Sequence, residues 1–66
     1  MADTTPTSLE NAAAWNCDKA AYLSRCLRRE KNYSNRQEIL RCRTRHTANA
    51  EYCLKQADNL RQSANG

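Results

Sequence analysis

The second half of the chain places small and apolar residues at alternating steps of three and four, which is typical of one face of an α-helix. This stripe consists of Ile39, Cys42, His46, Ala50, Cys53, Ala57 and Leu60. At about 100° per residue these positions stay on one side of a helix. The pattern therefore predicts a helix over about residues 35–62 that buries this face.

The first half of the chain has a similar but less regular pattern, with two lines of apolar residues. One line contains Leu9, Ala13, Ala20, Leu23 and Leu27. The other line contains Trp15, Tyr22 and Cys26, at steps of seven and four. A helix over about residues 8–30 accounts for both lines. Because a single partner helix can cover only one of them, we expect the first line to face the second helix.

Two capping-box patterns indicate where these helices begin. Thr7 is followed three residues later by Glu10, and Ser34 is followed three residues later by Gln37. In such a box each side chain accepts a hydrogen bond from the backbone at the other end of the box. Pro6 then lies just outside the first helix, where its missing N–H does no harm.

Together the two helices predict an all-α fold, an antiparallel two-helix hairpin that forms a single domain over residues 1–66. A polar turn at about residues 31–34 joins the helices, and we expect flexible termini. Because the chain has neither Val nor Phe and no alternating apolar run, strands have little support.

The hairpin has few large apolar side chains for a core. The chain has 66 residues, of which six are Leu and one is Ile. Domains of this size usually need disulfides, a metal or a partner for stability. Four cysteines in so short a chain therefore predict stapling. The thin core also argues against an enzyme, since this chain cannot build the walls of a deep pocket.

The cysteines are divided between the two helices, Cys17 and Cys26 in the first, Cys42 and Cys53 in the second. Pairing within a helix is excluded, because nine or eleven residues at about 1.5 Å each exceed the ~4.4–6.8 Å between the Cα atoms of a disulfide. A crossed pairing needs parallel helices. The antiparallel hairpin therefore predicts nested bridges, Cys26 with Cys42 near the turn and Cys17 with Cys53 farther out.

Other chemistry at these residues has weaker support. Structural zinc sites bring cysteines in close pairs, and neither such pairs nor a redox Cys-x-x-Cys occur here. His46 lies on the apolar stripe between Cys42 and Cys53, so we predict a packed imidazole that donates a hydrogen bond to a neighbour. We expect no catalytic residue, no cofactor and no metal.

The net charge of +4 is unevenly distributed along the chain, with +6 between residues 25 and 45 and −2 over the rest. The basic residues of this segment are Arg25, Arg28, Arg29, Lys31, Arg36, Arg41, Arg43 and Arg45. Such a segment fits nucleic acid, anionic lipid or an acidic protein surface, and it is equally typical of a solvated face. We predict that Arg41, Arg43 and Arg45 contact a partner through their charge.

The second line of the first helix offers an aromatic edge that the hairpin does not need for its own packing. Buried aromatic side chains commonly dominate protein interfaces. We therefore predict that Trp15 and Tyr22 contact a partner subunit. The alternative is that these rings fold over the turn or simply lie at the surface.

The sequence contains no run of ~18 apolar residues that would span a membrane. No apolar segment follows a basic start, as it does in a secretory signal, and no Lys or Arg precedes Lys19, which argues against a cleavable mitochondrial presequence. If the cysteines are oxidised, we expect either a mature secreted chain or a compartment with its own oxidative import route.

Two helices with two cysteines each resemble the coiled-coil-helix-coiled-coil-helix family, the twin Cys-x9-Cys proteins of the mitochondrial intermembrane space. The resemblance covers about residues 16–54. Within the family, the ten-residue gap between Cys42 and Cys53, the Asn16-Cys17 pair and the run 22–26 are similar to cytochrome c oxidase subunit 6B. The first gap is eight residues instead of nine, which puts Cys17 and Cys26 about 180° apart on the helix.

The resemblance implies a location in the intermembrane space, peripheral on the inner membrane as part of a complex. It also implies oxidative import, in which an oxidoreductase docks on an aromatic and an aliphatic residue beside a cysteine, here Tyr22, Leu23 and Cys26. Copper chaperones of the family carry an extra adjacent Cys-Cys before the first motif, and that place is occupied here by Ala14-Trp15-Asn16. Metal delivery is therefore disfavoured.

Three functions remain open. The first is a non-catalytic accessory subunit of a respiratory-chain complex, similar to cytochrome c oxidase subunit 6B or to a complex I accessory subunit, with other subunits and the import machinery as partners. The second is a small mitochondrial ribosomal protein of the same family that binds RNA through Arg25 to Arg45. The third is a secreted helical hairpin stapled by disulfides.

Overall fold

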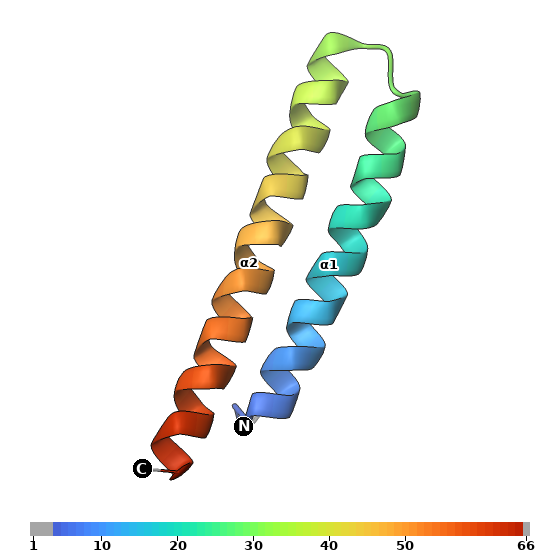
Figure 1. The fold of residues 1–66 in the computed structure, drawn as a ribbon. Coiled ribbons are helices and arrows are strands. Elements are labelled where there is room, and N and C mark those ends of the chain that lie inside the picture. Colours follow the sequence, from blue (N-terminus) through green and yellow to red (C-terminus); the bar gives the residue numbers. More distant parts are fainter. Residues whose placement is uncertain (1–3, 66) are drawn as a thin grey trace.

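The computed structural model describes residues 4–65, which form two α-helices joined by a short turn. Helix α1 spans Pro6–Arg29 and helix α2 spans Tyr33–Asn65. The helices run antiparallel, with the two ends of the chain at the same end of the molecule (Figure 1). This all-α hairpin confirms the predicted architecture over the described residues, which contain no strand. Of the termini that the sequence predicts to be flexible, residues 1–3 and 66 lie outside the described residues.

The hairpin is a thin rod, about 51 Å long and 18–19 Å across. Its length is set by α2, because 33 residues at about 1.5 Å each extend over ~50 Å. Neither helix, over the described residues, contains a stretch that is both long and apolar enough to cross a membrane.

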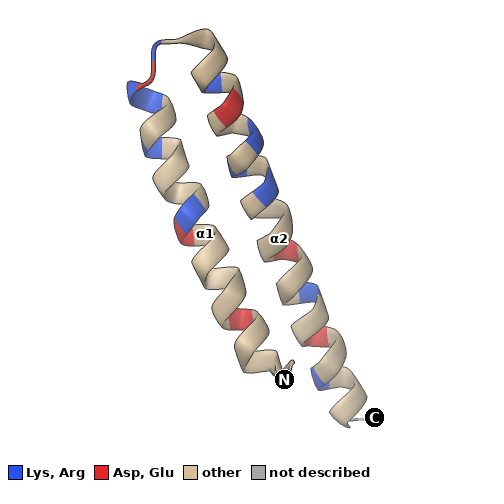
Figure 2. Ribbon diagram, turned by 180° about the vertical axis from the view of Figure 1, so that it is seen from behind, with Lys and Arg blue, Asp and Glu red and all other residues tan. Residues whose placement is uncertain are grey.

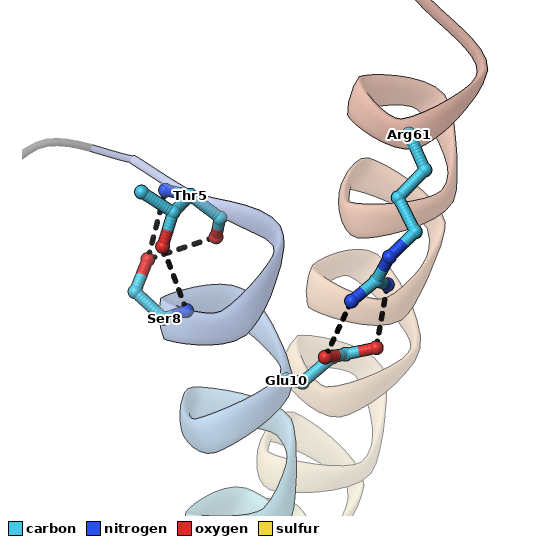
Figure 3. A network of polar contacts seen from close by, with 4 residues as sticks. All are labelled: Thr5, Ser8, Glu10 and Arg61. Carbon is cyan, nitrogen blue, oxygen red and sulfur yellow. Dashed lines mark hydrogen bonds and ion pairs between the residues drawn. The ribbon is translucent and has the colours of Figure 1, made fainter. Parts of the chain in front are cut away.

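Helix α1 begins two residues earlier than predicted, and the Thr7–Glu10 capping box is not the one that forms. Thr5 is the cap, and its side-chain oxygen accepts from the Ser8 backbone N–H at 3.0 Å while the Ser8 hydroxyl accepts from the Thr5 N–H at 3.0 Å (Figure 3). Pro6 therefore lies inside the helix at its first position. Proline fits there because its fixed φ suits a helix and the N–H that it lacks would have no partner.

The turn consists of Glu30 to Asn32 and is one residue shorter than predicted at 31–34. Asn32, not Ser34, caps α2, since its Oδ1 accepts from the Asn35 N–H at 3.0 Å. The Glu30 carboxylate accepts from the Asn32 N–H at 3.0 Å. These bonds satisfy polar backbone groups that a tight turn would otherwise leave to solvent.

The end of α1 receives a cap from the other helix. Arg36 donates through Nη1 to the carbonyl oxygens of Leu27 at 2.7 Å and Glu30 at 2.9 Å. The last carbonyls of a helix have no partner within it, and the negative end of the helix dipole favours a cation. A residue of α2 therefore completes α1 and fixes the distance between the helices at the turn.

The seam between the helices is built from small side chains. The buried residues are Ala13, Asn16, Ala50 and Ala57. Among the described residues no large side chain is fully buried, and Leu9, Leu23, Leu27 and Ile39 are only half-buried. The predicted inward line of α1 is confirmed, but the helices meet through alanine contacts more than through interdigitated leucines.

We predict that enlarging one seam residue separates the helices. Ala50→Leu should lower the free energy of unfolding by about 1–3 kcal/mol, because overpacking forces neighbours off their preferred positions. The matched control is Ala48→Leu, since Ala48 is exposed in the same helix. Thermal unfolding followed by circular dichroism measures both variants. Equal stability of the two would contradict the alanine seam.

Candidate functional site

The four cysteines are free thiols in the structure. Cys17 and Cys42 are exposed, whereas Cys26 and Cys53 are half-buried. The prediction that Cys42 lies on the buried stripe of α2 is wrong. Arg43 occupies that place, half-buried, because its Nη1 reaches across to the Ser24 hydroxyl on α1 at 3.3 Å. The two predicted disulfides stay predictions.

At the other end of the stripe Leu60 is also outside the seam, with an exposed fraction of 38%. The packed line of α2 runs instead through residues seven apart, Arg36, Arg43, Ala50 and Ala57. Seven residues are nearly two full turns, so this line stays toward α1. The helix is therefore rotated slightly from the orientation that the apolar pattern predicted.

Cross-helix contacts define two flanks of the hairpin. On the ionic flank, Glu10 and Arg61 form a two-pronged ion pair with N–O distances of 2.6 and 2.9 Å (Figure 3). The Ser24–Arg43 contact lies on the same flank, since 14 residues bring a helix back to within about 40°. Arg61 holds the pKa of the Glu10 carboxyl below its usual value.

On the other side, the aromatic flank, Trp15 of α1 meets His46 of α2 edge to face, with ring centroids 5.6 Å apart. Cys26 lies on the same face of α1 as Trp15, because eleven residues return a helix to within about 20°. Cys42 lies one turn from His46. The predicted pair Cys26–Cys42 therefore occupies one flank, close to the turn.

The second predicted pair is divided between the flanks. Cys17 is seven residues from both Glu10 and Ser24, which places it on the ionic flank. Cys53 is seven residues after His46, which places it on the aromatic flank. A bridge between Cys17 and Cys53 therefore requires one helix to turn relative to the other, whereas the Cys26–Cys42 bridge does not require a change of flank.

A buried polar contact lies at the middle of the seam. Asn16, only 7% exposed, donates through Nδ2 to the Ala12 carbonyl at 2.8 Å, and its Oδ1 lies 2.8 Å from Nδ1 of His46. Because the Asn16 amide nitrogen is already used as a donor, its oxygen accepts and the His46 Nδ1–H donates. The prediction that His46 is a packed imidazole donating to a neighbour is confirmed.

Trp15 is 55% exposed, and the remaining part of its side chain is covered by other residues of the hairpin. One contact is with His46, and the Lys19 ammonium lies 5.3 Å from the ring centroid in a cation–π arrangement. Tyr22 is 56% exposed, and within residues 4–65 it makes no aromatic or cation–π contact with α2. The predicted interface residues therefore differ, since Trp15 also contributes to the hairpin and Tyr22 lies outward.

The residues predicted to dock the import machinery lie together on α1. Leu23 and Cys26 are half-buried, and Tyr22 lies one turn before Cys26. Interaction of the Tyr22 hydroxyl with the Cys26 side chain raises the pKa of Tyr22, an effect that the charges of Arg25 and Arg29 partly oppose. Tyr22 and Cys26 therefore lie one turn apart on the same side of α1.

The basic residues gather in the half of the hairpin near the turn (Figure 2). Three of the eight are engaged within the molecule. Arg36 caps α1, Arg43 contacts Ser24, and Arg41 forms an exposed ion pair with Glu38 at 3.1 Å. Of the residues predicted to contact a partner by charge, Arg41 and Arg45 are exposed and Arg43 is half-buried.

Sequence reasoning missed the roles of Asn16 and Arg36. Asn16 is a polar residue within the apolar line of α1, and the sequence pattern singled it out only as the residue before Cys17. Its spacing of three from Ala13 and four from Ala20 does place it on the inward line, which is the available signal. No pattern in the sequence pointed to Arg36. A basic residue in the first turn of a helix is unfavourable for that helix, and Arg36 of α2 instead stabilises the end of α1.

Three hollows on the surface of residues 4–65 are open to solvent. One of them, of about 450 Å³, lies between the start of α1 and the end of α2, lined by Thr5, Pro6, Leu60 and Arg61 among others. Within residues 4–65 no three His, Cys, Asp or Glu side chains come together as a metal site would require.

No protein-family model, no curated protein and no solved structure matches this chain. A function is therefore inferred from the chain's own residues and from the resemblance of its cysteine pattern.

We predict that Asn16→Ala destabilises the hairpin by about 1–3 kcal/mol, because it leaves the His46 Nδ1–H without an acceptor inside the seam. The control is Asn11→Ala, which removes an exposed asparagine from the same helix. Chemical denaturation measures both. In the wild type, ¹⁵N NMR should find the neutral His46 ring protonated at Nδ1. A ring protonated at Nε2 would contradict this hydrogen-bond assignment.

Proposed function

We propose that this protein is a non-catalytic, structural accessory subunit of a respiratory-chain complex of the mitochondrial inner membrane, docked on the intermembrane-space side. The observation that carries the proposal is the combination of an alanine seam with an outward aromatic edge. The seam buries no large side chain, while Trp15 and Tyr22 are more than half exposed. A hairpin of this kind gains stability from a staple and from a partner.

The aromatic edge is the part that a partner subunit would cover. Each large aromatic side chain buries about 150–250 Å² when it enters an interface. Tyr22 has no role in the seam, so its burial against a partner costs the hairpin nothing. Trp15 is held in place by His46 and Lys19, and a ring that is already ordered loses little entropy on binding.

We further propose that two disulfides staple the mature protein, Cys26 with Cys42 and Cys17 with Cys53. The first bridge joins residues on the aromatic flank, and it is the one we expect to form first. The second requires α1 and α2 to rotate about each other, because its thiols start on opposite flanks. Each bridge would add about 3–4 kcal/mol through the lost entropy of the unfolded chain.

Among respiratory complexes, the cysteine spacing and the run 22–26 favour a subunit similar to cytochrome c oxidase subunit 6B, with a complex I accessory subunit as the next choice. Import would follow the oxidative route, with Tyr22, Leu23 and Cys26 as the docking residues. The position of Tyr22 one turn before Cys26, on the same side of α1, is in keeping with that role.

The second candidate is a small mitochondrial ribosomal protein. The observation in its favour is the set of basic residues near the turn that have no acidic partner among residues 4–65, because such residues can neutralise RNA phosphates. Against it, Tyr33 is the only aromatic residue between Arg25 and Arg45 that could stack on a base. The two candidates separate by whether the protein migrates with an inner-membrane complex or with ribosomes.

We predict that mass spectrometry of the unreduced protein, digested into peptides, recovers Cys26 linked to Cys42 and Cys17 linked to Cys53. Cys42→Ser should prevent accumulation of the assembled protein, since it removes the bridge beside the turn. A dominant peptide linking Cys17 to Cys42 would contradict both the pairing and the antiparallel staple.

We predict that Tyr22→Ala lowers incorporation into the complex at least tenfold while the free hairpin keeps its helix content. The reason is the loss of a central aromatic contact, which commonly costs about 2 kcal/mol or more. Native gels of mitochondria followed by mass spectrometry measure incorporation, and circular dichroism measures folding. The control is Tyr52→Ala, an exposed tyrosine of α2. Co-migration of the protein with ribosomes would favour the second candidate.

A further inference from the structure

We propose that Arg25, Arg28 and Arg29 form a docking site for the phosphate groups of an anionic lipid bilayer. The inference rests on the proposed function, which puts the protein beside the inner membrane, but the site itself is argued from the contacts and placement of these three residues. It names a second partner for the hairpin in addition to the protein subunits.

The three arginines share one face of α1. At about 100° per residue they fall within an arc of ~100°. This arc begins at the ionic flank, where Arg28 lies eighteen residues after Glu10, and extends to the side of α1 that is turned away from α2. All three are exposed. They alone line a surface hollow of about 290 Å³. A guanidinium group presents a planar fork of donors that matches phosphate oxygens, so three of them around one hollow suit a phosphate group.

These arginines are also among the basic residues that the fold leaves without a partner, together with Lys31 and Arg45 of the same segment. Neither ion pair among residues 4–65 includes them, and none donates a side-chain hydrogen bond there. The acidic residue next in the chain, Glu30, accepts from the Asn32 N–H in the turn. By contrast, Arg36, Arg41 and Arg43 are already engaged. Three of the four unpaired arginines between residues 25 and 45 therefore lie on α1, around one hollow.

The grouping of three unpaired arginines on one helix favours a flat partner over an enclosing one. An anionic bilayer meets a rod along one face, and basic residues near its surface are attracted to the headgroups. A folded RNA that surrounded the rod would use cations on both helices.

The test is sedimentation of the purified, oxidised full-length protein with vesicles of phosphatidylcholine containing 20% cardiolipin. We expect the wild type to bind these vesicles and not pure phosphatidylcholine. The triple variant Arg25→Gln, Arg28→Gln and Arg29→Gln should bind roughly 100-fold more weakly, since each basic residue near such a surface contributes about fivefold. Circular dichroism checks that the variant remains helical.

The matched control changes the same charge elsewhere, by Arg41→Gln, Arg45→Gln and Lys55→Gln. We expect it to bind within threefold of the wild type. Equal losses in the two triple variants would overturn the proposal, because the attraction would then be general and not a site. Tighter binding to an RNA oligonucleotide than to the vesicles would overturn it in favour of nucleic acid.

The lipid site and the proposed function can be refuted separately. A wild type that fails to bind cardiolipin vesicles, yet migrates with a respiratory complex on native gels, refutes only the lipid site. A protein that binds vesicles through the three arginines but is absent from every respiratory complex refutes only the proposed function.

Discussion

The helices of this protein approach through alanines, and every other feature depends on that constraint. Ala13, Ala50 and Ala57 allow close packing but supply little of the shape that fixes one helix against another. Large side chains fitting into grooves usually set the rotation and register of packed helices. Here polar contacts do so, with Asn16 and His46 in the middle and Arg36 at the turn.

The polar contacts differ in what each contributes. The Asn16–His46 bond is the one shielded by the seam, so breaking it leaves a buried polar group unpaired. Both side chains of the Glu10–Arg61 pair are partly exposed to solvent, and such pairs stabilise a fold only modestly. Arg36 acts on backbone carbonyls instead of on a charge. The register of α1 against α2 is therefore set by the contacts near the turn and in the middle of the hairpin. The end away from the turn, with the Glu10–Arg61 pair, adds little to it.

The spacing of apolar residues predicted the two helices, their antiparallel arrangement and the inward line of α1. It misplaced Cys42 and Leu60, because periodicity weighs a cysteine or leucine above an arginine, whereas the long stem of Arg43 can lie in the seam while its head reaches Ser24. The start of α1 was also misplaced, since Thr5 and Thr7 are equally good caps and only the position of Pro6 separates them. At the candidate site, the position of His46 on the apolar stripe of α2 predicted a packed imidazole that donates a hydrogen bond. The acceptor, Asn16, lies on α1, and no local sequence pattern indicates a pairing between the two helices.

The cap that Arg36 gives to α1 also bears on the order in which the hairpin forms. It joins residues only six and nine apart, whereas the Glu10–Arg61 pair closes a separation of 51 residues. The entropy lost on closing a loop grows with its length, so the contact beside the turn forms at lower cost. Chains rich in such local contacts fold quickly. The hairpin is therefore built to close from the turn outward, and the end held by the Glu10–Arg61 pair is the last part to form and the first to open.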